Sequence, residues 1–103
     1  ATIDAGCERP TIIDDGAYIM KTVHIGHDAI IHKNVTISPH AVIGGFVEIH
    51  EDTNIGMNAT IHQRVTIPSK CMVGMSAVIT KKTHTESNTV LVGNPARITR
   101  PNK

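Results

Sequence analysis

The chain has 103 residues, of which 40% are hydrophobic, 18% charged and 2% aromatic. A chain of this length holds one domain, and with no Trp, one Tyr and one Phe its core must be built from Ile, Val and Ala. The chain has ten Lys and Arg and nine Asp and Glu, so its charge is nearly balanced and the composition favours neither a nucleic-acid-binding nor a membrane-surface protein. No apolar run is long enough to cross a membrane and no signal-peptide pattern opens the chain, so we expect a soluble, cytoplasmic protein.

An aliphatic, β-branched side chain recurs at every sixth position from residue 13 to residue 79. A second column of small or β-branched side chains lies two residues before each of these positions. A six-residue period fits neither an α-helix nor a long strand, whereas two inward positions separated by one residue fit a short strand followed by a turn. The first column consists of Ile13, Ile19, Ile25, Ile31, Ile37, Ile43, Ile49, Ile55, Ile61, Ile67, Val73 and Ile79.

The third residue after each aliphatic position is often of a type that accepts positive φ, such as Gly16, Asp28, Asn34 and Asn58. Each hexad is therefore predicted to be one short strand and one bend. Repeats of this kind are typical of a parallel β-helix, in which every coil hydrogen-bonds to the next. The two cysteines, Cys7 and Cys71, fall on inward columns and are expected to be core side chains.

The repeat over about residues 11–82 resembles that of the hexapeptide-repeat transferases. The resemblance implies an all-β protein, a left-handed parallel β-helix with three hexads in each eighteen-residue coil, and a homotrimer of such prisms. Four full coils would then follow a less regular partial coil at the N-terminus. We expect a single β-helix domain over residues 1–103.

The segment 83–103 departs from the repeat and is expected to cover the last coil as an irregular capping tail. Residues 83–88 are polar, and only Leu91 returns to the aliphatic phase. Residues 89–92 have the composition of one more short strand, and residues 93–95, Gly-Asn-Pro, have that of a turn.

In eighteen-residue coils, residue n lies beneath residue n+18 at about one strand spacing, ~4.8 Å. One corner column therefore stacks His27 on a glycine, with further glycines beside it. Such a histidine could be a general base whose neighbouring glycine amide stabilises an oxyanion, or a solvated turn residue beside turn glycines. The two columns are His27, Gly45, Gln63 and Lys81, and Gly26, Gly44 and His62.

Two stretches of sequence resemble acyltransferases within this family. The segment 23–29, Val-His-Ile-Gly-His-Asp-Ala, is similar to the His-x-x-His-Asp segment of UDP-N-acetylglucosamine acyltransferases, and His62-Gln63 is similar to their downstream His-Gln pair. Residues 37–45 and 92–97 are similar to sugar acetyltransferases acting on sialic acids and bacillosamine-type amino sugars. The resemblance implies transfer of an acyl group, acetyl above all, from a CoA-type thioester to a hydroxyl or amine of a small acceptor such as a sugar.

The resemblance assigns roles residue by residue. His27 would be the general base, Asp28 would orient its imidazole, and the backbone amide of Gly45 would stabilise the oxyanion. These groups would converge with substrate across a subunit interface, so that activity would require the trimer.

The resemblance also implies that His24, His62 and Gln63 contact substrate and that Arg97 binds CoA phosphates. The donor would be acetyl-CoA, another acyl-CoA or an acyl carrier protein, and no metal is expected. Phe46 departs from the lipid-A-pathway enzymes, which usually have a further histidine at this position, so the acceptor stays open.

Two other functions remain as alternatives. Residues 26–32 resemble the Gly-His-x-x-x-x-His segment of γ-class carbonic anhydrases, which would make His27, His32 and His50 candidate metal ligands, with Asp14 in the same column as the last two. Exposed histidines without a partner are the competing interpretation of this set. The third possibility is a noncatalytic β-helix that serves as an interaction module.

Overall fold

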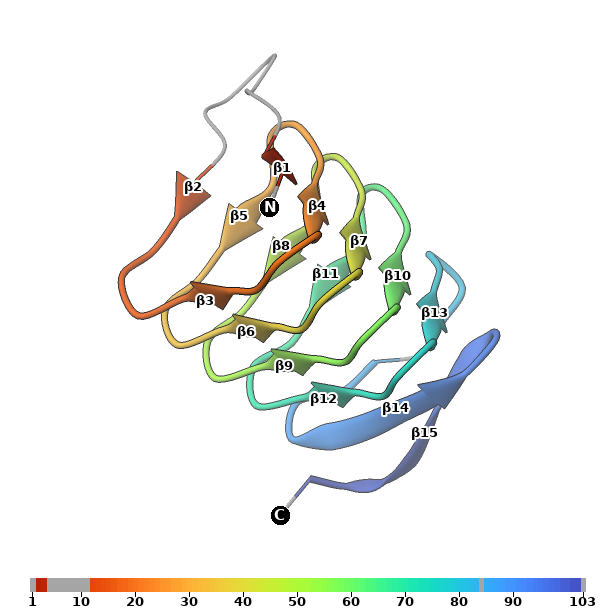
Figure 1. The fold of residues 1–103 in the computed structure, drawn as a ribbon. Helices are drawn as coiled ribbons and strands as arrows, with labels where there is room; N and C mark the ends of the chain where they lie inside the picture. Colours follow the sequence, from red (N-terminus) through yellow and green to blue (C-terminus); the bar gives the residue numbers. More distant parts are fainter. Residues whose placement is uncertain (1, 4–11, 84, 103) are drawn as a thin grey trace.

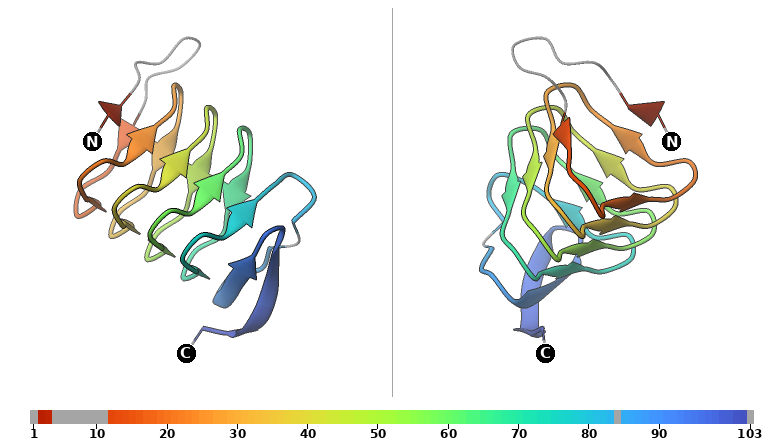
Figure 2. Two further views of the ribbon diagram at one scale, coloured as in Figure 1. Left: turned by 45° about the vertical axis from the view of Figure 1, so that its right-hand side comes forward. Right: turned by 90° about the vertical axis from the view of Figure 1, so that its left-hand side faces the viewer.

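The computed structural model describes residues 2–3, 12–83 and 85–102, which form strands and turns. The chain winds as a rising coil, and each turn of the coil carries one short strand on each of three faces (Figure 1). Viewed from the side, the coils stack in parallel layers with the chain ends at opposite ends of the stack (Figure 2). The predicted all-β, left-handed parallel β-helix is confirmed.

Three sheets make up the faces of the prism, and successive strands from β1 to β13 fall in sheets A, B and C in turn. After β13 in sheet A, the next two described strands, β14 and β15, both belong to sheet C. Sheet A contains β1 (Thr2–Ile3), β4 (His24–Ile25), β7 (Val42–Ile43), β10 (Thr60–Ile61) and β13 (Val78–Ile79). Sheet B contains β2 (Ile12–Ile13), β5 (Ile30–Ile31), β8 (Glu48–Ile49) and β11 (Thr66–Ile67). Sheet C contains β3 (Tyr18–Ile19), β6 (Thr36–Ile37), β9 (Asn54–Ile55), β12 (Met72–Val73), β14 (Thr89–Gly93) and β15 (Ala96–Pro101).

The strands of successive coils pair in parallel with a register of eighteen residues. His24 pairs with Val42, Val42 with Thr60 and Thr60 with Val78. The prediction that residue n lies beneath residue n+18 is therefore confirmed, and side chains eighteen residues apart are neighbours on the surface.

The bends between strands have a uniform backbone. Ten non-glycine residues spaced six apart, from Thr22 to Ser76, have φ between 57° and 64°. This left-handed conformation suits Asn and Asp, which occupy several of these positions, and is unfavourable for β-branched or bulky residues such as Thr22 and Phe46. The predicted bend chemistry is confirmed, and the packing of the coils imposes the bend even where the residue disfavours it.

The core is a stack of aliphatic side chains inside the prism. From Ile25 to Ile79, every member of the sixfold aliphatic column is almost completely buried. Burial of each isoleucine contributes roughly 2 kcal/mol, so aromatic side chains are not needed. The column is not buried throughout: Ile13 is 36% exposed because β2 is the edge strand of its sheet.

The C-terminal tail forms a hairpin on the last coil. β14 pairs in parallel with β12 and antiparallel with β15, and the buried Leu91 continues the core. The predicted extra strand and turn are confirmed, while β15 is a second strand that the sequence pattern did not indicate.

Cys71 is buried as expected, and Cys7 lies outside the described residues. Among the described residues, no helix has the length and apolarity that a membrane crossing requires.

Candidate functional site

The corner between β4 and β5 carries His27 and Asp28, and the left-handed backbone of Asp28, with φ of 60°, turns the chain there. The His27 side chain is 43% exposed, but its Nδ1 atom is buried and lies 3.5 Å from Oδ2 of the fully buried Asp28. Nδ1 has no hydrogen-bond partner among the described residues, so this contact is a close electrostatic approach and not a hydrogen bond.

Gly45 lies one coil along from His27, as the column predicted. A Cβ atom at Gly45 would stand 3.0 Å from both Cε1 and Nε2 of His27, so the imidazole rests directly against the glycine backbone. The Gly45 carbonyl accepts a hydrogen bond from the Arg64 amide at 2.9 Å, whereas its own N–H donates to no described residue. A histidine ring edge and an unused amide donor therefore adjoin each other at this corner.

An aromatic and a guanidinium group stack beside the same histidine. The rings of His27 and Phe46 meet edge to face with centroids 5.4 Å apart, and the Arg64 guanidinium lies 4.4 Å from the centroid of Phe46. Both residues belong to the corner column that starts at Asp28, at intervals of eighteen. The eighteen-residue spacing could therefore have identified Phe46 and Arg64 from the sequence. The edge-to-face contact with Phe46 helps to hold the imidazole in place.

The predicted substrate-binding residues are distributed around this corner. His62 and Gln63 are exposed on the next coil and line an open depression of about 450 Å³ together with Lys81 and Lys82. His24 is half-buried on the outer face of β4. Arg97 is exposed on β15, and so lies on the C-terminal hairpin and not at the His27 corner.

A second hollow, of about 490 Å³, lies between the start of β15 and the chain after β13, and is lined by Thr80, Lys82, Arg97 and neighbouring residues. Lys82 and Thr80 also line the first depression, so the two hollows adjoin. Three cationic side chains, Lys81, Lys82 and Arg97, consequently border a continuous stretch of surface that leads away from His62.

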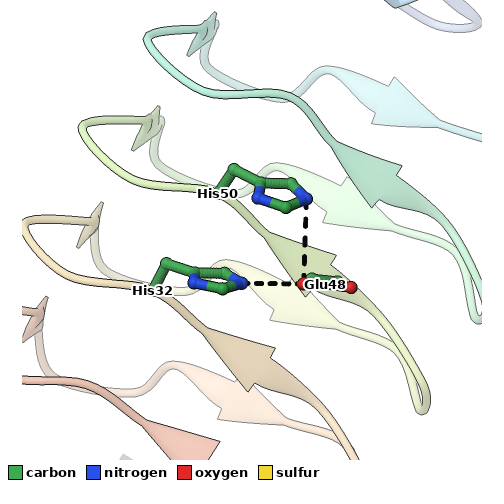
Figure 3. Close-up of side chains that lie close together, drawn as sticks. All are labelled: His32, Glu48 and His50. Carbon is green, nitrogen blue, oxygen red and sulfur yellow. Dashed lines mark hydrogen bonds and ion pairs between the residues drawn. The ribbon is translucent and has the colours of Figure 1, made fainter.

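A separate cluster lies on sheet B and contains His32, Glu48 and His50. The two imidazoles stack with centroids 4.7 Å apart, and Oε2 of Glu48 lies 2.7 Å from Nε2 of His32 and 3.7 Å from Nε2 of His50 (Figure 3). The sequence suggested His27, His32 and His50 as alternative metal ligands. In the structure Glu48 joins His32 and His50, whereas His27 lies at the preceding corner beside Asp28. Sequence reasoning missed Glu48 because it compared residues only within one column; residues 48 and 50 also share a face, since side chains alternate along a strand.

Comparisons with known proteins agree with this architecture. The family model described as bacterial transferase hexapeptide (six repeats) matches residues 10–45. No curated protein sequence matches the chain. A UDP-N-acetylglucosamine acyltransferase structure is 30% identical, with a TM-score of 0.91, over 97% of this chain and 39% of its own. WeeI from Acinetobacter baumannii AYE is 28% identical, with a TM-score of 0.69, over 86% of this chain and 55% of its own.

A variant of perosamine N-acetyltransferase from Caulobacter crescentus, solved with CoA and GDP-perosamine, shares the fold at 17% identity and a TM-score of 0.61, over 86% of this chain and 57% of its own. The present chain spans about two fifths of the length of the UDP-N-acetylglucosamine acyltransferase structure. The fold and repeat define a left-handed parallel β-helix built from hexapeptide repeats, of which residues 10–45 match the transferase hexapeptide model. The resemblance to the hexapeptide-repeat acyltransferase family that the motifs indicated is confirmed.

Proposed function

We propose that this protein transfers an acyl group, preferably acetyl, from a CoA-type thioester to a hydroxyl or amine of a small acceptor such as a sugar. The observation that carries the proposal is the His27 corner. A half-exposed imidazole stands there beside a buried carboxylate and against a glycine whose amide donates to no described residue.

His27 serves as the general base in this proposal. Its Nδ1 is buried next to Asp28, so the exposed part of the ring is the remaining edge, which includes the Nε2 side that faces Gly45. Nε2 takes the proton from the acceptor as the acceptor oxygen or nitrogen attacks the thioester carbonyl. Asp28 stabilises the resulting imidazolium and keeps the ring oriented.

The Gly45 amide is proposed to stabilise the oxyanion of the tetrahedral intermediate. Collapse of this intermediate re-forms the carbonyl, breaks the C–S bond and releases the thiolate, which recovers the proton from His27. A backbone donor that needs no reorganisation is suited to this role. The absence of a side chain at Gly45 lets the imidazole of His27 pack directly against the glycine backbone.

The donor is proposed to lie along the cationic surface formed by Lys81, Lys82 and Arg97, whose charges suit the phosphates of CoA. His62 and Gln63 border the same hollow and are proposed to contact substrate. His24, on β4 of the sheet that also contains β10, is proposed to contact substrate as well. The CoA-bound perosamine enzyme offers a precedent for the donor in a protein of this fold. We also propose a homotrimer in which a neighbouring prism completes the groove.

The direct test measures release of free thiol from acetyl-CoA and from a longer acyl-CoA, over a panel of amino and hydroxyl sugars. His27→Ala is expected to lower turnover by about 10²- to 10⁴-fold, because general base catalysis contributes that much. Asp28→Asn, which keeps a residue suited to positive φ, is expected to lower kcat while leaving KM for the donor nearly unchanged.

His40→Asn is the matched control, because His40 is an exposed corner histidine with φ of 64° at another edge of the prism. Sedimentation analysis establishes that each variant keeps the assembly of the wild type. Full activity in His27→Ala contradicts the role of the base. Absence of turnover and of any acyl-CoA-dependent rise in the unfolding midpoint of the wild type contradicts the transferase proposal itself.

A further inference from the structure

The cluster on sheet B has the composition and arrangement of a cation site, and it is independent of the His27 corner. Each of His32, Glu48 and His50 is about one third exposed, so the ligand atoms are reachable from solvent while the stems are held by the coil (Figure 3). Their ligand atoms all lie within 4.8 Å of one another. We propose that these three residues bind one divalent transition-metal ion, for which zinc is the best match.

The two distances from Glu48 are close to those between ligand atoms of a tetrahedral ion. Zinc bonds to imidazole nitrogen and carboxylate oxygen are about 2.0–2.1 Å long, which places neighbouring ligand atoms of a tetrahedral ion about 3.3 Å apart. The Oε2 atom of Glu48 is 2.7 Å from Nε2 of His32 and 3.7 Å from Nε2 of His50, so the two values bracket the required one. The two imidazoles are stacked nearly in parallel, with all ligand atoms within 4.8 Å, so the rings must turn towards a common point by side-chain rotation to take the ion.

The rigid frame of the helix explains why the three groups stay together. His32 and His50 follow β5 and β8 at the same point of successive coils, and Glu48 projects from β8 on the same face. Strand pairing therefore fixes the spacing of the two imidazoles, whose planes differ by only 11°. Preorganised ligands lose little conformational freedom on binding, which favours affinity.

A carboxylate lies near the second ring nitrogen of one of the ligands. Nδ1 of His32 lies 3.8 Å from Oδ2 of Asp14, while Nε2 of the same ring points to Glu48. Ligating histidines almost always place their second nitrogen near a carboxylate or carbonyl in this way, which fixes the tautomer. Asp14 is therefore proposed to position His32 when the ion is bound.

Two imidazoles and one carboxylate are a ligand set that zinc accepts, and three protein ligands leave a coordination position for water or an exogenous ligand. Calcium and magnesium prefer all-oxygen sites, so the two histidines select against them. The ion would link His32 of one coil to Glu48 and His50 of the next.

The test titrates Zn²⁺ into chelator-treated, untagged protein by calorimetry and follows the unfolding midpoint in parallel. The expected result is one zinc per chain and a raised midpoint that chelator reverses. His50→Ala and Glu48→Gln are expected to abolish saturable binding, and Asp14→Asn to weaken it about 10- to 100-fold. Co²⁺ in place of zinc should give a visible absorption band in the wild type that is absent from His50→Ala.

His40→Asn is again the matched control and should bind zinc as the wild type does, since this exposed histidine lies outside the cluster. Circular dichroism of the metal-free variants distinguishes loss of the site from loss of the fold. Unchanged zinc affinity in His50→Ala and Glu48→Gln, or no saturable binding by the wild type, overturns the proposal. The acyl-transfer assay does not enter this test, so its outcome is separate from that of the proposed function.

Discussion

Ile13 and Ile49 offer a controlled measure of what the stacked core contributes to stability. The two isoleucines occupy the same hexad position and the same column on sheet B, two coils apart. Ile49 is completely buried between Ile31 and Ile67, whereas Ile13 lies on the edge strand and is 36% exposed. The substitutions Ile49→Ala and Ile13→Ala therefore remove the same atoms from two environments that differ in burial.

The expected costs follow from that difference. Replacing a fully buried isoleucine by alanine removes three carbon atoms, worth about 2.4 kcal/mol at ~0.8 kcal/mol each, and the enclosed cavity raises the total to about 3–5 kcal/mol. At Ile13 the partial exposure reduces the transfer cost to about 1.5 kcal/mol, and the open side leaves no enclosed cavity. Ile49→Ala should thus destabilise the protein by at least about 1.5 kcal/mol more than Ile13→Ala does.

The assay is urea unfolding followed by far-ultraviolet circular dichroism, with all variants at one protein concentration because the proposed trimer would make the apparent stability depend on concentration. The difference should appear in the midpoint, with a similar slope for both variants. An equal loss of stability in the two variants, or a larger loss for Ile13→Ala, would refute the account of the core as a stack whose end coil is only partly closed.

Two further predictions concern backbone geometry. Asn58 is exposed and has φ of 59°, so Asn58→Val should destabilise the protein by about 1–2 kcal/mol while Asn58→Gly should be nearly neutral, as measured by urea unfolding. Gly45→Ala should displace the imidazole of His27, since the new Cβ would lie 3.0 Å from Cε1 and Nε2, and should therefore reduce kcat in the thiol-release assay. Unchanged turnover in Gly45→Ala would mean that the contact between glycine and imidazole has no part in catalysis.

The sequence was sufficient to predict the fold because a single six-residue repeat determines nearly every strand, bend and core position. The aliphatic column, the bend residues and the length of the coil repeat without interruption from Thr22 to Ile79, and the structure has the same register. The six-residue repeat does not predict burial or strand pairing correctly where no coil is stacked on one side. Ile13 has the repeat pattern but not the burial, because burial depends on the coil stacked against it, and β15 has no hexad pattern because it pairs antiparallel with β14.

The candidate sites were predictable only in part. The column rule placed Gly45 beside His27, since both lie on one corner at a separation of one coil. The pairing of His32 with Glu48 was not predicted, because it joins side chains from two adjacent columns and depends on rotamers. The orientation of His27, with Nδ1 buried towards Asp28, likewise follows from the local packing and not from spacing.

The eighteen-residue register also limits how the length of this chain can change. Deleting six residues between His27 and Gly45 would turn every later coil by one face of the prism, so that Gly45 would lie on another edge from the histidine although each hexad stayed intact. Deleting eighteen residues would restore every alignment and shorten the prism by one strand spacing, about 4.8 Å. Insertions and deletions within the helix are therefore expected in whole coils, and the distance between two sites on one face changes only in steps of that size.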